Sequence, residues 1–173
     1  MTIPIPKSSK NFIKDFLFSS ILCIFAEKKK ESEMNVEREN HIVCSQKGLS
    51  TALGMEFIST PEPDTCMARM RVDERNRQPF GFLSGGATLA LAENLAGVGS
   101  MALCPGKICV GVSVSGSHVK AVAEGDTVTA YGRLLHKGRT LHQWQIDIRN
   151  SAEELISTVQ VTNYVISPKK KEE

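Results

Sequence analysis

The feature that most constrains this sequence is a long apolar stretch, Gly85 to Leu103, which predicts a buried helix. Ala, Leu, Gly and Val dominate the stretch, and a helix that is apolar nearly all round is normally buried. Pro105 and Gly106 end it. At about 19 residues, interrupted by Glu93 and several glycines, it does not fit a membrane span. The rest of the chain must therefore cover one central helix.

The segments around this helix alternate apolar and polar residues, are rich in β-branched side chains, and are separated by turn residues. Such segments predict antiparallel strands. Two precede the helix and four follow it, while Ser45–Leu53 is expected to form a short helix. The predicted fold is α+β, with a curved antiparallel sheet wrapped around one long central helix. The expected strands are Met55–Ser59, Thr65–Val72, Ile108–Val114, Thr127–Leu135, Leu141–Arg149 and Leu155–Val165.

A chain of 173 residues has room for one domain of this kind. We expect residues 1–40 to be a leader outside the fold, residues 41–167 to be the domain, and residues 168–173 to be a charged, solvated tail.

The leader allows two interpretations. Lysines precede an apolar run from Phe16 to Ala26, which resembles a secretory signal but is too short to span a membrane. Cys stands in the cleavage region where Ala is typical, so we favour an appendage outside the fold. In that interpretation the natural start is near Met34.

Charge and cysteine content exclude several classes of protein. From residue 34 onward, 15 basic residues balance 15 acidic ones, whereas nucleic-acid binders normally need a basic face. The five cysteines include no CxxC pair, so neither a disulfide framework nor a metal site is indicated. We expect a cytoplasmic protein that needs no metal and no cofactor.

Glu93 is out of place in the apolar helix, because a carboxylate is costly to bury. It faces solvent, pairs across an interface, or performs chemistry. Gly85 and Gly86 begin the same helix, where exposed backbone N–H groups stabilise negative charge on a carbonyl oxygen. Eight residues separate Gly85 from Glu93, which is about 12 Å along the helix axis. A dimer partner would have to bring such donors to the carboxylate.

The stretch from Arg77 to Glu93, RQPFGFLSGGATLALAE, resembles the signature (Q/H)PxGxLHGGxxxxLAE. This signature belongs to thioesterases of the hotdog fold that are related to the phenylacetate-degradation thioesterase. The resemblance covers about residues 45–166. It is nearest the branch that acts on 1,4-dihydroxy-2-naphthoyl-CoA and 4-hydroxybenzoyl-CoA. It implies hydrolysis of an acyl-CoA thioester, with an aromatic acyl group and a possible place in menaquinone synthesis.

The resemblance also implies roles for individual residues. Glu93 matches the catalytic carboxylate, acting as nucleophile or as general base. The backbone N–H of Gly85 and the side chain of Gln78 match the groups that hold the thioester carbonyl. His118 and Lys120 match positions near coenzyme A, and Gly86 adjoins the carbonyl site.

Two positions depart from the family pattern. Ser84 replaces the His of the HGG triplet, with a shorter reach to the substrate. Gly97 stands where relatives often carry a Ser or Thr that places a water. The alternatives are therefore a non-catalytic acyl-CoA-binding module and a dehydratase, which normally needs a catalytic His. The family also implies a homodimer or homotetramer whose active sites are shared between subunits.

Overall fold

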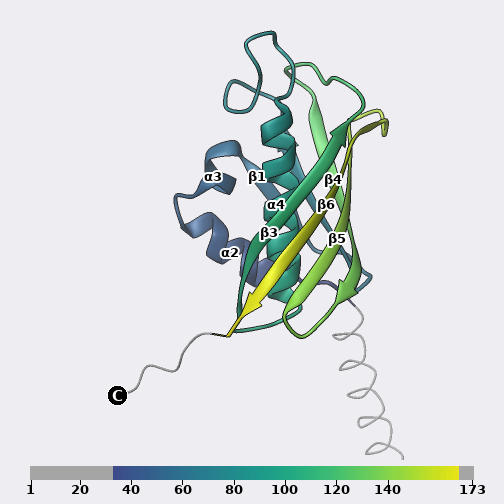
Figure 1. The fold of residues 1–173 in the computed structure, drawn as a ribbon. Helices are drawn as coiled ribbons and strands as arrows, with labels where there is room; N and C mark the ends of the chain where they lie inside the picture. The colour runs from purple at the N-terminus through teal and green to yellow at the C-terminus, as the bar shows by residue number, and fades with distance from the viewer. Residues whose placement is uncertain (1–32, 168–173) are drawn as a thin grey trace, which may run out of the picture. The chain divides into compact units, whose positions relative to one another are not determined.

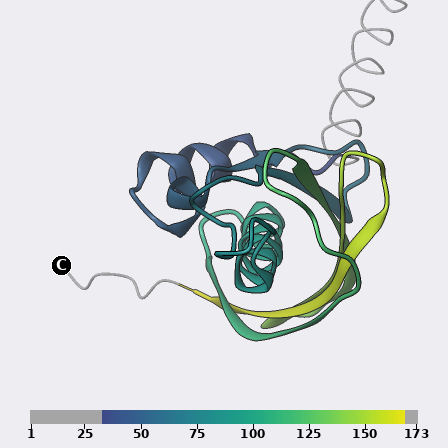
Figure 2. The ribbon, with the colours of Figure 1, turned by 90° about the horizontal axis from the view of Figure 1, so that it is seen from above.

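The computed structural model describes residues 33–167 of the chain. The apolar run Phe16–Ala26 lies outside the described residues. Within them, one curved sheet of six strands wraps around the helix α4, Gly85–Ala102 (Figure 1). Seen along its axis, the helix lies in the hollow of the sheet (Figure 2). The expectation of an α+β fold with one central helix is confirmed.

The sheet has the strand order β1-β2-β4-β5-β6-β3, and every neighbouring pair is antiparallel. This order leaves β1 and β3 as the two edges. The strands lie close to the predicted segments: β1 Met55–Ile58, β2 Thr65–Arg71, β3 Ile108–His118, β4 Thr127–Lys137, β5 Leu141–Arg149 and β6 Leu155–Ile166.

Strand β3 runs four residues further than its sequence pattern indicates, to His118 rather than Val114. Its second half contains small polar residues that break the apolar alternation, yet they keep pairing with β6 as far as Ser157. A shift in register between Gly111 and Ser113 marks a bulge. Pairing with a neighbouring strand has therefore extended β3 beyond its own propensity.

The packed unit also begins earlier than expected, at Met34 rather than at His41. Met34 and Val36 are buried, and Met34 pairs with Thr60 beside β1. The short helix predicted for Ser45–Leu53 is present as α3, Leu49–Leu53, whereas the helix before it, α2 Glu37–Ser45, was not predicted. The burial of Met34 and Val36 explains why residues 34–40 belong to the domain.

The core is formed where α4 meets the sheet. Leu91 and Leu95 are fully buried, and Trp144 of β5 lies against the helix. A side chain at Gly99 would collide with the Trp144 ring, since an added Cβ would lie 2.9 Å from it. Gly99 therefore lets the helix approach the sheet closely. None of the helices among residues 33–167 is long and apolar enough to cross a bilayer.

Candidate active site

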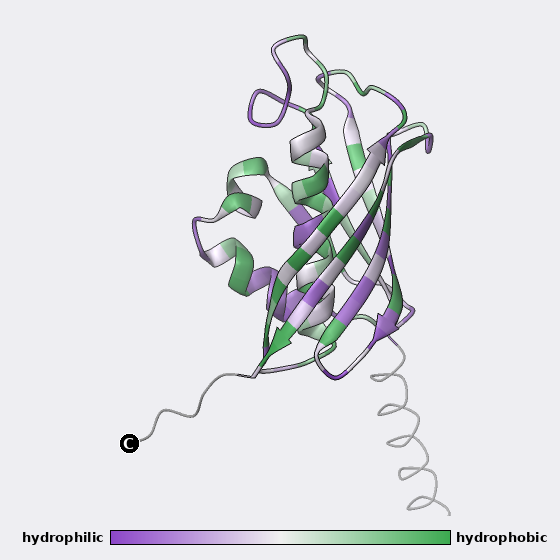
Figure 3. Ribbon diagram, viewed as in Figure 1, coloured by the Kyte–Doolittle hydropathy of each residue, from purple (hydrophilic) through white to green (hydrophobic). Residues whose placement is uncertain are grey.

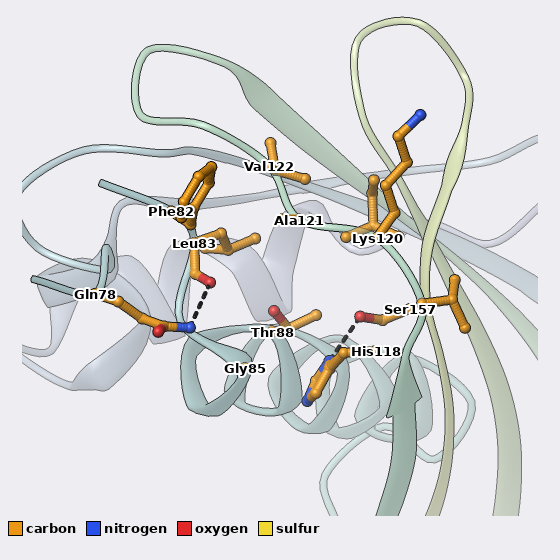
Figure 4. Close-up of a pocket in the computed structure, with 12 residues that line it drawn as sticks. Gln78, Phe82, Leu83, Gly85, Thr88, His118, Lys120, Ala121, Val122 and Ser157 are labelled. Atoms are coloured by element: carbon orange, nitrogen blue, oxygen red, sulfur yellow. Dashed lines mark hydrogen bonds between the residues drawn. The ribbon is translucent and has the colours of Figure 1, made fainter. Parts of the chain in front are cut away.

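Four of the predicted site residues gather around the N-terminus of α4. Gln78, Gly85, His118 and Lys120 line one pocket of about 380 Å³ (Figure 4). They come from the loop before α4, from the first residue of the helix, and from the end of β3 with the segment that follows it. The fold thus brings together residues that lie up to 42 positions apart in the sequence.

Gln78 is held on a loop that folds back on itself. Its backbone N–H donates to the Phe82 carbonyl at 2.6 Å, and its side-chain Nε2 donates to the Leu83 carbonyl at 3.3 Å. The side-chain bond is long for an N–H···O hydrogen bond. Gln78 is also exposed, so its amide can turn toward a ligand at small cost.

Asn76 holds the start of this loop in place, a role that the sequence analysis did not predict. It is 3% exposed, and its side chain bonds the Asp73 backbone N–H and the Arg71 carbonyl. The Asn76 carbonyl accepts a hydrogen bond from the Ser84 backbone N–H at 2.9 Å. Asn76 therefore sets where α4 begins.

Position 85 requires a glycine because the imidazole of His118 lies close to its backbone. An added Cβ at Gly85 would lie 2.7 Å from His118 Nε2, so any side chain would displace the imidazole. The other ring nitrogen, Nδ1, lies 2.8 Å from the hydroxyl of the buried Ser157 (Figure 4). Ser157 thus orients His118 with Nε2 toward the start of the helix, where backbone N–H groups lack partners within the helix.

Lys120 lies at the rim of the pocket and points away from Gly85 (Figure 4). Its ammonium group forms an ion pair with Glu154. The hydrogen bond from Lys120 holds the pKa of the Glu154 carboxyl below its usual value. Both side chains are about half exposed, so the pair is weak and can open for an anionic ligand.

Glu93 does not line this pocket. Together with Gly97 it lines a separate pocket of about 280 Å³, between α4, the edge strand β3 and the segment around α2 and α3. The Glu93 carboxylate lies over Gly111 of β3, where an added Cβ would be 2.3 Å from Oε1. In the protomer Glu93 is exposed, so the cost of burying its charge does not arise there.

Ser84 and Gly86 line a third pocket, of about 350 Å³, with Arg75 and Arg77. The backbone carbonyl of Ser84 accepts the N–H of Thr88 at 3.1 Å, but the Ser84 hydroxyl does not cap the helix. The eight predicted residues are therefore divided among three pockets of one protomer.

Two of the described cysteines, Cys66 and Cys109, offer little nucleophilic character. Burial raises the pKa of the Cys66 thiol well above its usual value and raises that of Cys109 to about 11. Because the thiolate is the reactive form, neither side chain is a nucleophile near neutral pH. Within residues 33–167 no cluster of His, Cys, Asp and Glu has the makings of a metal site.

Comparison with known proteins gives a consistent picture. The sequence profile of the Thioesterase superfamily matches residues 80–157. A 1,4-dihydroxy-2-naphthoyl-CoA hydrolase from Listeria monocytogenes is 32% identical, over 72% of this chain and 98% of its own. The crystal structure of a Haemophilus influenzae thioesterase superposes with a TM-score of 0.71 at 35% identity, covering 80% of this chain and 95% of its own.

A thioesterase from Staphylococcus aureus is also similar, with 30% identity, a TM-score of 0.64, and coverage of 69% of this chain and 98% of its own. Two of its solved structures carry single alanine substitutions, one of a glutamine and one of a glutamate. Those two positions are as far apart in that chain as Gln78 and Glu93 are in this one.

Proposed function

This chain belongs to the Thioesterase superfamily and is an acyl-CoA thioesterase of the hotdog fold, and we propose that its substrate carries an aromatic acyl group. The first candidate is 1,4-dihydroxy-2-naphthoyl-CoA, which the similar enzyme from Listeria monocytogenes hydrolyses according to its name. That substrate would place the enzyme in menaquinone synthesis and in the cytoplasm.

We assign the carbonyl-binding role to Gly85 and Gln78. The observation that carries this assignment is that both line one pocket at the N-terminus of α4, beside His118. A backbone N–H at a helix N-terminus and an amide N–H can both donate to the thioester oxygen. Their hydrogen bonds strengthen as charge develops on that oxygen, which lowers the barrier to attack on the carbonyl carbon.

We assign the reacting carboxylate to Glu93, by one of two routes. As nucleophile, it attacks the carbonyl carbon, the C–S bond breaks, coenzyme A leaves, and water then hydrolyses the acyl-enzyme anhydride. As general base, it removes a proton from water, which attacks directly. Both routes give the free acid and coenzyme A, and neither requires a metal.

The position of Glu93 calls for a second subunit. Gly85 lies eight residues earlier on the same helix, about 12 Å along its axis, and the two residues line different pockets. We propose a two-fold dimer in which Glu93 of one subunit meets Gly85 and Gln78 of the other.

The edge strand β3 is the surface we propose for this dimer. Among residues 33–167 it pairs on one side only, and Ile108, Val110 and Val112 are each at least 40% exposed. Apolar residues recur along β3 in Figure 3, whereas β5 is more hydrophilic. An exposed apolar edge favours pairing with another strand. Joining two β3 strands would bring both α4 helices, with their Glu93 side chains, to the interface. A homotetramer would combine two such dimers.

Coenzyme A release over a panel of aroyl-CoA and fatty acyl-CoA thioesters tests the proposed function. We expect the highest kcat/KM with an aromatic acyl group. Preference for a long fatty acyl group would overturn the substrate assignment, and saturable binding without thiol release would identify a binding module instead. Sedimentation analysis in the same buffer tests the dimer.

A further inference from the structure

The pocket that contains Glu93 also contains a buried amide with no assigned role. Asn163 of β6 is completely buried and lines this pocket. Its side-chain oxygen, Oδ1, has no hydrogen-bond donor within reach among the described residues. Buried polar atoms are nearly always paired, and an unpaired one calls for an explanation.

A buried hydrogen-bond network fixes the orientation of this amide on the side of its nitrogen. Asn163 Nδ2 donates to Ser100 Oγ at 3.1 Å, and the same oxygen accepts the indole N–H of Trp144 at 2.9 Å. Both partners are fully buried. The cross-strand neighbour of Asn163 on β5 is His142, whose Nδ1 also has no hydrogen-bond partner in the described part of the chain. The histidine therefore does not satisfy the amide oxygen.

Asn163 lies close to the reacting carboxylate. It pairs directly with Gly111 across β6 and β3, and the space above Gly111 is occupied by Glu93 Oε1. Residues paired in this way have their Cα atoms about 5 Å apart. An acyl group whose carbonyl carbon lies at Glu93 must therefore pass near Asn163. The side chains of Val98 and Met101 from α4, with Val43 and Leu49, form an apolar wall of the same pocket.

We infer that Asn163 is a specificity-determining residue that accepts a hydrogen bond from a hydroxyl group on the acyl chain. This inference rests on the proposed function, because it places the acyl group beside Glu93. A pocket with apolar walls and one fixed acceptor selects an apolar group that carries a single donor. An acyl group without that donor leaves the amide oxygen unpaired and is disfavoured.

The experiment compares benzoyl-CoA with its 2-, 3- and 4-hydroxy derivatives in wild type and in Asn163→Leu. In wild type we expect at least one hydroxylated isomer to exceed benzoyl-CoA in kcat/KM by about 10- to 100-fold. Asn163→Leu removes the acceptor and should bring this ratio close to one. Gln160→Leu is the matched control, since Gln160 is an exposed amide on the same strand, and it should leave the ratio unchanged.

Two outcomes would overturn the inference while leaving the proposed function intact. One is a wild-type enzyme that hydrolyses benzoyl-CoA as fast as every hydroxylated isomer. The other is an equal loss on all four substrates in a folded Asn163→Leu variant, which would indicate a role unrelated to the substituent. Should Asn163→Leu not fold, Asn163→Val offers a side chain suited to a strand and takes its place in the comparison. Absence of thiol release from every acyl-CoA would instead refute the proposed function.

Discussion

The two groups that we assign to the reaction, the carbonyl-binding N–H of Gly85 and the carboxylate of Glu93, lie on one helix but in different surroundings. At the N-terminus of α4, Gly85 faces a pocket shaped by a folded loop and by His118, which Ser157 holds in place. In the middle of the helix, Glu93 is exposed beside an edge strand, with Gly97 one turn away and offering no side chain. The donor end is complete within one protomer, whereas the carboxylate end is open where a second subunit could cover it.

This difference shows why a helix can position two reacting groups without letting them meet. The separation between Gly85 and Glu93 is set by the rise of the helix, about 1.5 Å per residue, and no side-chain rotation removes it. Two antiparallel helices related by a two-fold axis would place each carboxylate opposite the partner's N-terminus.

The largest effect is expected from Glu93→Gln. The amide matches the carboxylate in size but can act neither as base nor as nucleophile, so kcat should fall by several orders of magnitude, on the order of 4 kcal/mol or more in barrier. Because Glu93 is exposed in the protomer, the melting temperature should stay near that of wild type. Thiol-release kinetics with differential scanning fluorimetry measure both, and a wild-type kcat would remove Glu93 from the chemistry.

Mixing two inactive variants tests the link between the two ends. Gly85→Pro removes the backbone N–H at the start of α4, and Glu93→Gln removes the carboxylate. If each site uses one end from each subunit, random exchange should restore about one quarter of wild-type activity, because half of the dimers hold one intact site. Each variant incubated alone is the control. No recovery after demonstrated exchange, or full activity in a monomer, would show that one protomer suffices.

Gly111→Ala perturbs the carboxylate end without touching its charge. A methyl group at Gly111 would lie 2.3 Å from Glu93 Oε1, and the flexible carboxylate can move aside. Stability should therefore change little, while displacing the carboxylate by about 1 Å should cost roughly 100-fold in kcat. Ser113→Ala, an exposed position on the same strand, is the matched control and should keep full activity. Unchanged kcat in Gly111→Ala would mean that this position of Glu93 is not the reactive one.

The sequence predicted the fold better than it predicted the site, and the reason lies in how local each signal is. Apolar patterns within a few residues predict the helix from Gly85 and the strand Leu141–Arg149, and the structure confirms both. The start of the domain was missed for two reasons. The helix Glu37–Ser45 has only a weak apolar face, and the segment before it is held by the pairing of Met34 with Thr60, which is distant in the sequence.

For the site, a motif indicated Gln78, Gly85 and Glu93, but not how they are distributed over separate pockets. The polar residues Ser157 and Asn163 went unnoticed because serine and asparagine in a strand usually face solvent. Their spacing held a signal, since both are in step with the inward-facing Val159 and Val161. Two-residue periodicity could therefore have placed them on the inner face.

The smallest effect is expected from removing residues 1–33, which precede the packed unit. Gly85 and Glu93 should both keep their neighbours, so kcat/KM and the melting temperature should stay close to those of the full chain. Removing residues 1–40 is the informative counterpart, because it also deletes the buried Met34 and Val36. Each buried side chain contributes about 1.5–3 kcal/mol, so this longer truncation should lower the melting temperature by several degrees or more.

The longer truncation should also disturb the Glu93 pocket, which Val43 and Leu49 help to form, before it disturbs the pocket at Gly85. Thermal unfolding and thiol-release kinetics on both truncations distinguish these cases. Equal losses in the two variants would show that residues 1–33 contribute to the stability of the domain.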